Sequence, residues 1–208
     1  MADNALLNDE DRARIRAAVR AAEARTSGEF VTVIAHQSSN YSSVPILWAA
    51  LIALCVPALV LLIAPNTAFT LIYGAQVASF FALALVFNVP SVRLLLAPAA
   101  LKREKSQQLA RSQFTQQGLH RTRNGTGVLL FVSVAERYVE ILADEGINSR
   151  VAPDTWNKIV QQFVEKVREG HAADGFVDAI RQCGDVLAEH FPVTNDDVNE
   201  LSDRMVEL

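Results

Sequence analysis

The most prominent feature of the hydrophobic pattern is a long uncharged block in the first half of the chain. Residues 44–92 contain no Asp, Glu, Lys or Arg. Within this block, apolar runs at residues 46–64 and 68–89 are separated only by Pro-Asn-Thr at residues 65–67. Each run has about the 20 residues that a helix needs to cross a bilayer. The pattern therefore predicts a transmembrane helical hairpin over residues 44–90.

Other residues in the block fit a membrane hairpin. Trp48 and Tyr73 fall near opposite interfaces, where aromatic belt residues occur. Ala49 and Ala53 are expected to supply one side of the contact between the helices. The facing stripe is predicted from small residues at every fourth position of the second run: Gly74, Ala78 and Ala82. The alternative is a core helix pair of a soluble protein, but such a pair would show a polar face.

Basic residues near the spans predict the orientation. The turn has no basic residue, and Arg20 and Arg25 precede the first span at a greater distance. Because basic loops stay in the cytoplasm, both flanking parts are predicted to be cytoplasmic and the turn external. Residues 91–98 are expected to lie along the membrane surface. The basic residues after the second span are Arg93, Lys102, Arg103, Lys105 and Arg111.

The parts of the chain that flank the hairpin show the periodicities of a soluble α/β protein. Residues 8–25 predict a helix capped by Asn8, and residues 29–35 predict a strand rich in β-branched residues. Residues 192–208 are acidic and predict a mobile tail or a short amphipathic helix. The remaining expected elements are a helix at 103–119, strands at 127–134 and 138–143, and helices at 154–169 and 174–190.

These elements make sense only as one body, because the strand before the hairpin needs the later strands as neighbours. The predicted fold is α/β: a three-layer α/β/α sandwich with a mixed sheet, interrupted by the transmembrane hairpin. The predicted division is a first part at 1–43, the hairpin at 44–90, a second part at 91–191 and the acidic tail at 192–208.

Composition and charge exclude several classes of function. The formal net charge is −4, and no basic patch of the kind that binds nucleic acid is present. Cys55 and Cys183 have no spacing partner for a metal site or a disulfide framework, so both are interpreted as small hydrophobic residues. The acidic, helical start of the chain predicts that there is no cleaved signal and no lipidation.

Several segments outside the hairpin share the pattern of a known domain family. They are Thr26–Val33, Asn124–Ser133, Arg137–Gly146 and Val151–Trp156, with the spaced positions Ala110, Phe114, Gly118, Gly170, Phe176, Ile180 and Leu187. Over about residues 26–36 and 104–191 the chain resembles the TPM domain family. The membrane-bound bacterial branch, in which two spans interrupt the domain, is the most similar.

The resemblance implies an α/β/α sandwich but no single activity. Plant members of the family are linked to acid phosphatase activity and photosystem repair, some members bind calcium, and an animal member is an auxiliary subunit of a receptor channel. Many TPM domains lie outside the cytoplasm, which conflicts with the orientation predicted from the basic residues. Because a fold does not carry its function across such a range, the chemistry must be sought in particular residues.

The candidate metal ligands are acidic residues and an amide near the expected strand ends. Asp144 and Asp154 flank the turn at Gly146 and are expected to converge with Asn124. Together with Glu145 they offer the oxygen ligands that calcium prefers. The alternative is that Asp144 and Glu145 form a solvated turn while Asp154 caps a helix.

Neither the histidines nor any motif adds a catalytic site. His36, His120, His171 and His190 lack ligand spacing, although His36 and His120 could meet near one end of the sheet. The sequence therefore favours a non-enzymatic adaptor or assembly factor, held in the bacterial inner membrane and acting on another membrane or membrane-associated protein. A divalent-cation-dependent phosphatase is the alternative, so whether the chain is an enzyme stays open.

Overall fold

The computed structural model describes residues 7–122, 124–152, 154–193 and 205–208. The chain divides into two compact units. The first, called the α/β unit, combines Met1–Ser38 with Lys105–Leu208. The second, called the hairpin unit, is Ser39–Glu104.

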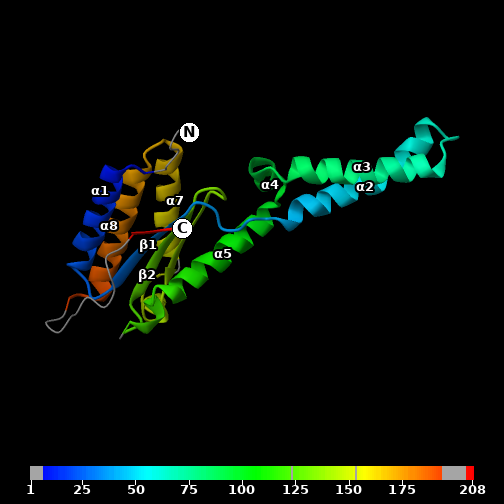
Figure 1. The fold of residues 1–208 in the computed structure, drawn as a ribbon. Helices are drawn as coiled ribbons and strands as arrows, with labels where there is room; N and C mark the ends of the chain where they lie inside the picture. The colour runs from blue at the N-terminus through cyan, green and yellow to red at the C-terminus, as the bar shows by residue number, and fades with distance from the viewer. Residues whose placement is uncertain (1–6, 123, 153, 194–204) are drawn as a thin grey trace. The chain divides into compact units, whose positions relative to one another are not determined.

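A mixed four-stranded sheet forms the centre of the α/β unit (Figure 1). Its strand order is β3-β2-β1-β4, so the strand before the hairpin pairs directly with the strand after it. β1 runs parallel to both β2 and β4, whereas β3 is antiparallel to β2. The strands are β1 (Glu29–Ala35), β2 (Gly127–Ser133), β3 (Tyr138–Ala143) and β4 (Met205–Glu207).

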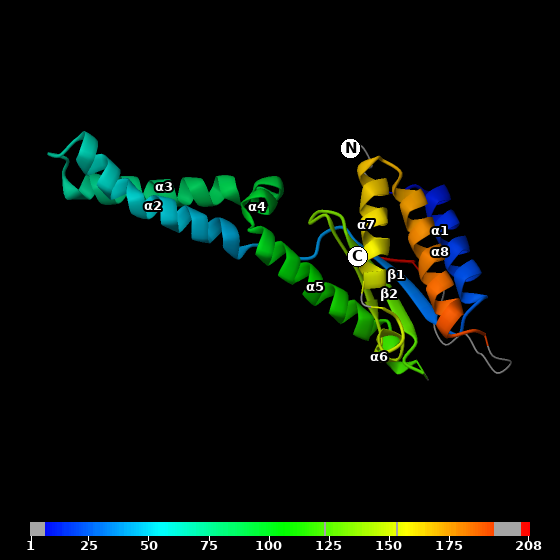
Figure 2. The ribbon, with the colours of Figure 1, turned by 180° about the vertical axis from the view of Figure 1, so that it is seen from behind.

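Helices cover both faces of this sheet. Helices α1 (Asp9–Glu23), α7 (Asp154–Arg168) and α8 (Ala172–His190) pack on one face, as Figures 1 and 2 show. The opposite face packs against α5 (Ala99–Gln116), whose Ala110 is fully buried. Every residue of β1 and β2 is buried, as expected for strands covered on both sides. The predicted three-layer α/β/α sandwich with a mixed sheet is confirmed.

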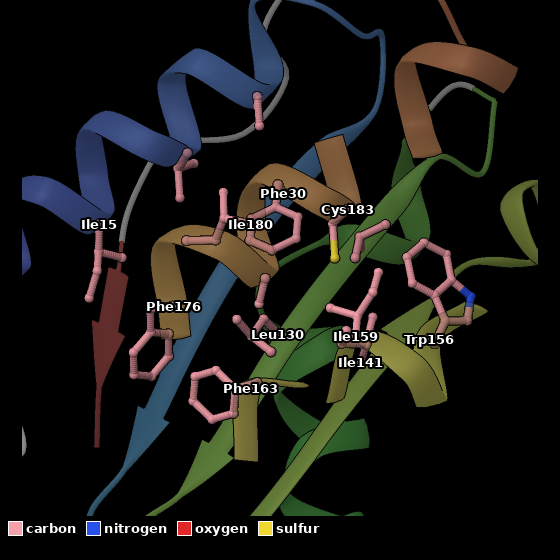
Figure 3. Close-up of a cluster of buried hydrophobic side chains, with 14 of the residues drawn as sticks. Ile15, Phe30, Leu130, Ile141, Trp156, Ile159, Phe163, Phe176, Ile180 and Cys183 are labelled. Carbon is pink, nitrogen blue, oxygen red and sulfur yellow. The ribbon is translucent and has the colours of Figure 1, made fainter. Parts of the chain in front are cut away.

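The larger hydrophobic core lies between the sheet and the three helices (Figure 3). Phe30 and Leu130 reach it from adjacent strands, and Ile180 comes from α8. Phe163 of α7 meets Phe176 of α8 edge to face, with ring centroids 4.8 Å apart. This cluster joins residues from both sides of the hairpin, so the two flanking parts form one core.

Local sequence signals position the first helix. Asn8 accepts a hydrogen bond from the backbone N–H of Asp11, whose carboxylate accepts one from the backbone N–H of Asn8. This reciprocal pair is a capping box, which satisfies amide groups that the helix start leaves free. The predicted Asn8 cap is confirmed, and Leu7 beside it is buried in the core.

The hairpin unit contains α2 (Ser43–Ile63), α3 (Phe69–Phe87) and the short helix α4 (Pro90–Leu96). Helices α2 and α3 lie side by side in both ribbon views (Figures 1 and 2). Both are long and apolar enough to cross a membrane, by length and composition. Ala49 and Ala53 are buried, as predicted for the helix contact.

The predicted facing stripe on the second helix is wrong. Gly74, Ala78 and Ala82 are exposed, and nothing lies within 4 Å of where a Cβ on Gly74 would be. The buried residue of α3 is instead Ile72. A helix that is apolar on every side gives no polar face from which its contact side can be read.

The end of the chain also differs from its prediction. Met205–Glu207 form β4, paired with β1 from Thr32 to Ile34, instead of a mobile tail or amphipathic helix. The rest of that prediction falls largely on residues 194–204, which lie outside the described residues. The strand was missed because its pairing partner is far away in the sequence.

Candidate functional site

Two tight turns bring part of the predicted metal site together. Asn124 and Gly125 precede β2, while Asp144 and Gly146 follow β3. A Cβ on Gly146 would lie 2.3 Å from the carbonyl oxygen of Asn124, so the turns approach as closely as backbone atoms allow. The backbone N–H of Asp144 donates to the carbonyl oxygen of Gly127 at 2.9 Å. Asn124 and Asp144 therefore share one end of the sheet, as predicted.

Asp144 has a local structural role, and Asp154 lies in a different element. The Asp144 carboxylate accepts a hydrogen bond of 2.8 Å from the backbone N–H of Glu145 and so caps the short helix α6 (Glu145–Asn148). Asp154 is exposed in the first turn of α7. Among the described residues, no group of three or more His, Cys, Asp or Glu side chains could hold a metal ion. The calcium site at Asn124, Asp144, Glu145 and Asp154 stays a prediction.

A polar cluster that the sequence analysis missed lies where the parallel strands β1 and β2 end. Ser38 Oγ donates to Ser133 Oγ at 2.7 Å and lies 3.0 Å from Ser106 Oγ. Since the Ser38 proton is used toward Ser133, Ser106 is the donor to Ser38. Ser133 in turn donates to the carboxylate of Glu136. That carboxylate also accepts from the backbone N–H of Ser38, at 3.0 and 3.1 Å to its two oxygens.

This serine–glutamate cluster joins three segments that are distant in sequence. Ser38 is the last residue before the hairpin unit, and Ser106 follows soon after it. Ser106 and Ser133 are fully buried. Their hydroxyls are therefore closed off from a substrate and hold the loop after β1 against β2 and α5. All four residues of the cluster belong to the α/β unit.

An apolar cleft of about 520 Å³ lies near the same strand end, between the β2–β3 turn and α7. Its apolar wall includes Val132, Val139 and Phe163, and its charged residues are Arg137 and Arg168. Arg137 has φ 53°, a left-handed conformation that is uncommon outside glycine. The cleft contains none of the predicted metal ligands.

Three further side chains considered in the sequence analysis are Cys183, His36 and His120. Cys183 is fully buried, and desolvation raises the pKa of its thiol, so the thiolate that a nucleophile requires is disfavoured. His36 and His120 are exposed. The backbone N–H of His36 donates to the carbonyl oxygen of Leu208 at 2.8 Å. This hydrogen bond joins the end of β1 to the residue that follows β4.

Comparison with known proteins supports the resemblance seen in the sequence. Residues 90–186 match the family model described as the TPM domain. The matched part runs from α4 into α8 and excludes α1 and β1, which precede the hairpin. The resemblance to the TPM domain family is confirmed.

A solved structure shares the fold. The NMR structure of the BA42 protein from the psychrophilic bacterium Bizionia argentinensis has a TM-score of 0.62 and 20% identity to this chain. The match covers 100% of this chain and 98% of the BA42 chain. At this identity the likeness describes the fold alone. No curated protein matches the chain.

Proposed function

We propose that this TPM-domain chain is an integral protein of the bacterial inner membrane and acts without catalysis, as an adaptor or assembly factor for other proteins. The observation that carries the proposal is the pair of apolar helices α2 and α3, placed inside the sequence of an α/β unit. In this proposal the hairpin unit is the anchor, the lipid bilayer is its surroundings, and the α/β unit recognises a membrane or membrane-associated protein.

The exposure of the two helices supports a membrane location. Only 11% of the most apolar window of α2 and 6% of that of α3 is buried inside the structure. A core helix of a soluble protein would bury most of such a surface, because large exposed apolar patches are costly in water. In a bilayer the same surface meets lipid, and the internal hydrogen bonds of each helix satisfy its backbone.

The basic residues support a cytoplasmic α/β unit. Arg93 in α4 and Lys102, Arg103 and Lys105 in α5 follow the second span, whereas the turn between the spans has no basic residue. Arg93 also donates to the side-chain oxygen of Asn88 at 2.8 Å, which fixes α4 next to the end of α3. Under the positive-inside rule these residues keep both ends of the hairpin on the inner side.

The adaptor role is favoured by what the polar groups do. The serine–glutamate cluster is internally hydrogen-bonded, and the Cys183 thiol is buried. Asp144 caps α6. Each of these groups has a structural task in the α/β unit, and a catalytic role would have to compete with it.

A divalent-cation-dependent phosphatase is the second candidate. It is favoured by the close approach of the Asn124 and Gly146 turns, which places Asn124 and Asp144 at one end of the sheet. In that case Asn124, Asp144, Glu145 and Asp154 would supply oxygen ligands to calcium or a related cation. Binding would require Asp154 and Glu145 to turn toward the other two residues.

Reporter fusions at the C-terminus test the membrane part of the proposal. A reporter active only in the cytoplasm is expected to be active, and one active only outside the inner membrane is expected to be silent. The reverse pattern would contradict the orientation. Recovery of the full chain in the soluble fraction of the cell would contradict membrane anchoring altogether.

A phosphatase assay of the full chain in lipid nanodiscs separates the two candidate functions. The adaptor proposal expects no calcium-dependent turnover of a general phosphomonoester. Turnover that Asp154→Ala abolishes while the thermal unfolding midpoint is kept would establish the phosphatase instead. Glu165→Ala, an exposed acidic position further along α7, is the matched control.

A further inference from the structure

The edge of β1 is covered by a very short segment from the other end of the chain. β4 contains three residues and pairs in parallel with Thr32, Val33 and Ile34. The backbone N–H of Leu208 donates to the carbonyl oxygen of Ile34 at 3.0 Å. The backbone N–H of His36 donates in return to the carbonyl oxygen of Leu208 at 2.8 Å.

The covered edge has a defined length. At its beginning, the backbone N–H of Phe30 donates to the carboxylate of Glu23 at 3.2 Å, so a side chain already occupies that position. At its other end, His36 is the last residue that bonds to the segment. Among the described residues, the edge is therefore open to strand pairing from Thr32 to His36. We call this stretch the acceptor edge.

A charged pair fixes the register of the segment on the acceptor edge. Arg12 of α1 donates through Nε to one carboxylate oxygen of Glu207 at 2.6 Å and through Nη2 to the other at 3.2 Å. Such two-point pairing is geometrically specific and stronger than a single neutral hydrogen bond. Asp9 contacts Nη1 of Arg12 at 3.0 Å and holds the guanidinium in place.

The two apolar residues Met205 and Val206 of the segment pack on opposite faces of the sheet. Met205 packs against the core cluster beneath α1, α7 and α8. Val206 packs against the opposite cluster with Val31 and Leu129. The segment thus presents two consecutive apolar residues on opposite faces and then a carboxylate, in the order Met-Val-Glu-Leu.

We propose that the acceptor edge is a binding site for an extended segment of a partner protein, with two apolar residues followed by Glu or Asp. Residues 205–208 occupy it in the structure and show which chemistry it recognises. A partner strand would form the same backbone hydrogen bonds with Thr32–His36 and place its carboxylate on Arg12. This is strand addition to a sheet edge, in which backbone bonds supply affinity and side chains supply specificity.

The shortness of β4 makes exchange feasible. Three paired residues and one charged pair give few interactions to break, since a strand commonly has about five or six residues. The segment benefits from being part of the same chain, which supplies an effective concentration in the millimolar range. A partner held at the same membrane gains a comparable advantage, so it competes on similar terms. The site itself does not depend on the proposed anchoring.

The test uses the full chain in lipid nanodiscs and a version that ends at residue 203. The probe is a fluorescent peptide with the sequence of residues 201–208, LSDRMVEL. Anisotropy is expected to show binding to the shortened chain, and binding to the intact chain at least about tenfold weaker because the tether keeps the edge occupied. Absence of binding to a shortened chain that keeps its helical circular dichroism would overturn the proposal.

Charge exchange identifies the site. In the shortened chain, Arg12→Ala is expected to weaken peptide binding about tenfold, the effect of losing one charge-assisted hydrogen-bonded pair. Arg12→Glu should abolish binding, and a peptide with Glu207→Arg should restore it. Arg14→Ala is the matched control, because Arg14 pairs with Asp174 instead of with the segment. If the shortened chain bound the peptide equally well with and without Arg12→Ala, Arg12 would not be part of the binding site.

A second variant covers the case in which the shortened chain does not fold. Glu207→Lys in the otherwise intact chain places two cations together and should release the segment. Its affinity for the unmodified peptide is expected to rise above that of the natural chain. An affinity no higher than that of the natural chain would count against exchange. Because none of these measurements reports topology, they fail or succeed independently of the reporter fusions.

Discussion

The two units of this chain obey opposite burial rules. In the α/β unit, every residue of β1 and β2 is buried, and the largest core side chains are shielded from solvent. In the hairpin unit, large apolar side chains are exposed along both long helices, for example Leu54 of α2 and Phe81 of α3. The same residue types therefore require different surroundings in the two units. The α/β unit supplies its own apolar interior, whereas the proposed membrane location would supply one to the hairpin unit from outside.

Shortening a phenylalanine should have different consequences in the two units. Phe176 is 0% exposed in the core, and Phe81 is 66% exposed on α3. Phe176→Ala should lower the free energy of unfolding by about 3–5 kcal/mol, because it removes apolar contacts and leaves a cavity. Phe81→Ala should have a small effect in nanodiscs. Chemical unfolding monitored by circular dichroism measures both.

An equal decrease in the free energy of unfolding for Phe176→Ala and Phe81→Ala would mean that Phe81 also lies in a packed protein core. That result would contradict the difference in burial between the two units. A smaller truncation, Phe176→Leu, serves as the control for the α/β unit. It should cost less than Phe176→Ala because most of the buried apolar volume remains.

Replacing an exposed apolar residue with lysine should affect the hairpin unit more than the α/β unit. Leu54 lies in the middle part of α2 and is 69% exposed, while Val193 in the α/β unit is 49% exposed. If lipid surrounds the hairpin, Leu54→Lys should oppose membrane insertion by about 3 kcal/mol. Val193→Lys should be tolerated because water surrounds it. The fraction of chain that resists alkaline extraction from membranes is the measurement.

Full membrane retention and unchanged stability of Leu54→Lys would place that face of α2 in water. The control is Leu54→Ile, which keeps the apolar character and size. It should leave both insertion and stability close to those of the natural chain.

The sequence predicted the α/β unit better than the hairpin contact, and the reason is physical. Amphipathic periodicity marks which side of α1 or α7 faces the core, and Asn8 marks where α1 begins. Helices α2 and α3 are apolar on every side, so Gly74 was assigned to the wrong face. Their buried side is decided by packing, which the pattern does not encode.

Contacts between residues far apart in the sequence were the second kind of feature that the sequence did not predict. β4 has three residues, too few for a strand pattern, and its register depends on β1 and Arg12. The serine–glutamate cluster depends on the fold in the same way, because Ser38 meets Ser106 and Ser133 only after the sheet has formed. Asn124 and Asp144 could be expected at one sheet end because both flank strands that the pattern did predict, and their role as metal ligands stays a prediction.

Enlarging a small residue should have different effects on the buried and the exposed side of the hairpin helices. Ala53 is buried, whereas a Cβ on Gly74 would meet nothing within 4 Å. Ala53→Leu should cost about 1–3 kcal/mol by forcing α2 and α3 apart. Gly74→Leu should be neutral or slightly stabilising, because leucine favours the helix more than glycine does. Thermal unfolding in nanodiscs measures both variants.

If Gly74→Leu lowered the thermal stability and Ala53→Leu did not, the helix contact would lie on the face that the sequence predicted, which includes Gly74. Ala53→Gly completes the set. It should keep the close approach of the helices while losing only the helical preference of alanine, about 1 kcal/mol.

The smallest expected difference between the units is their response to acid. A hydrogen bond from Arg14 at 2.5 Å lowers the pKa of Asp174, and a hydrogen bond from Lys166 lowers the pKa of Asp178. Because both pKa values are lower in the folded state than in the unfolded state, these pairs stabilise the fold above the ordinary carboxyl pKa of about 3.9. That contribution is lost as the pH falls through the folded values.

The unfolding midpoint of the α/β unit should therefore decrease below about pH 4, the usual range of a carboxyl group. The double variant Asp174→Asn, Asp178→Asn should flatten this decrease. The hairpin helices α2 and α3 contain no Asp, Glu, Lys or Arg, so their helix–helix contact should not respond over the same range. A hairpin contact that weakens in parallel with the α/β unit would show that the hairpin depends on that unit for its stability.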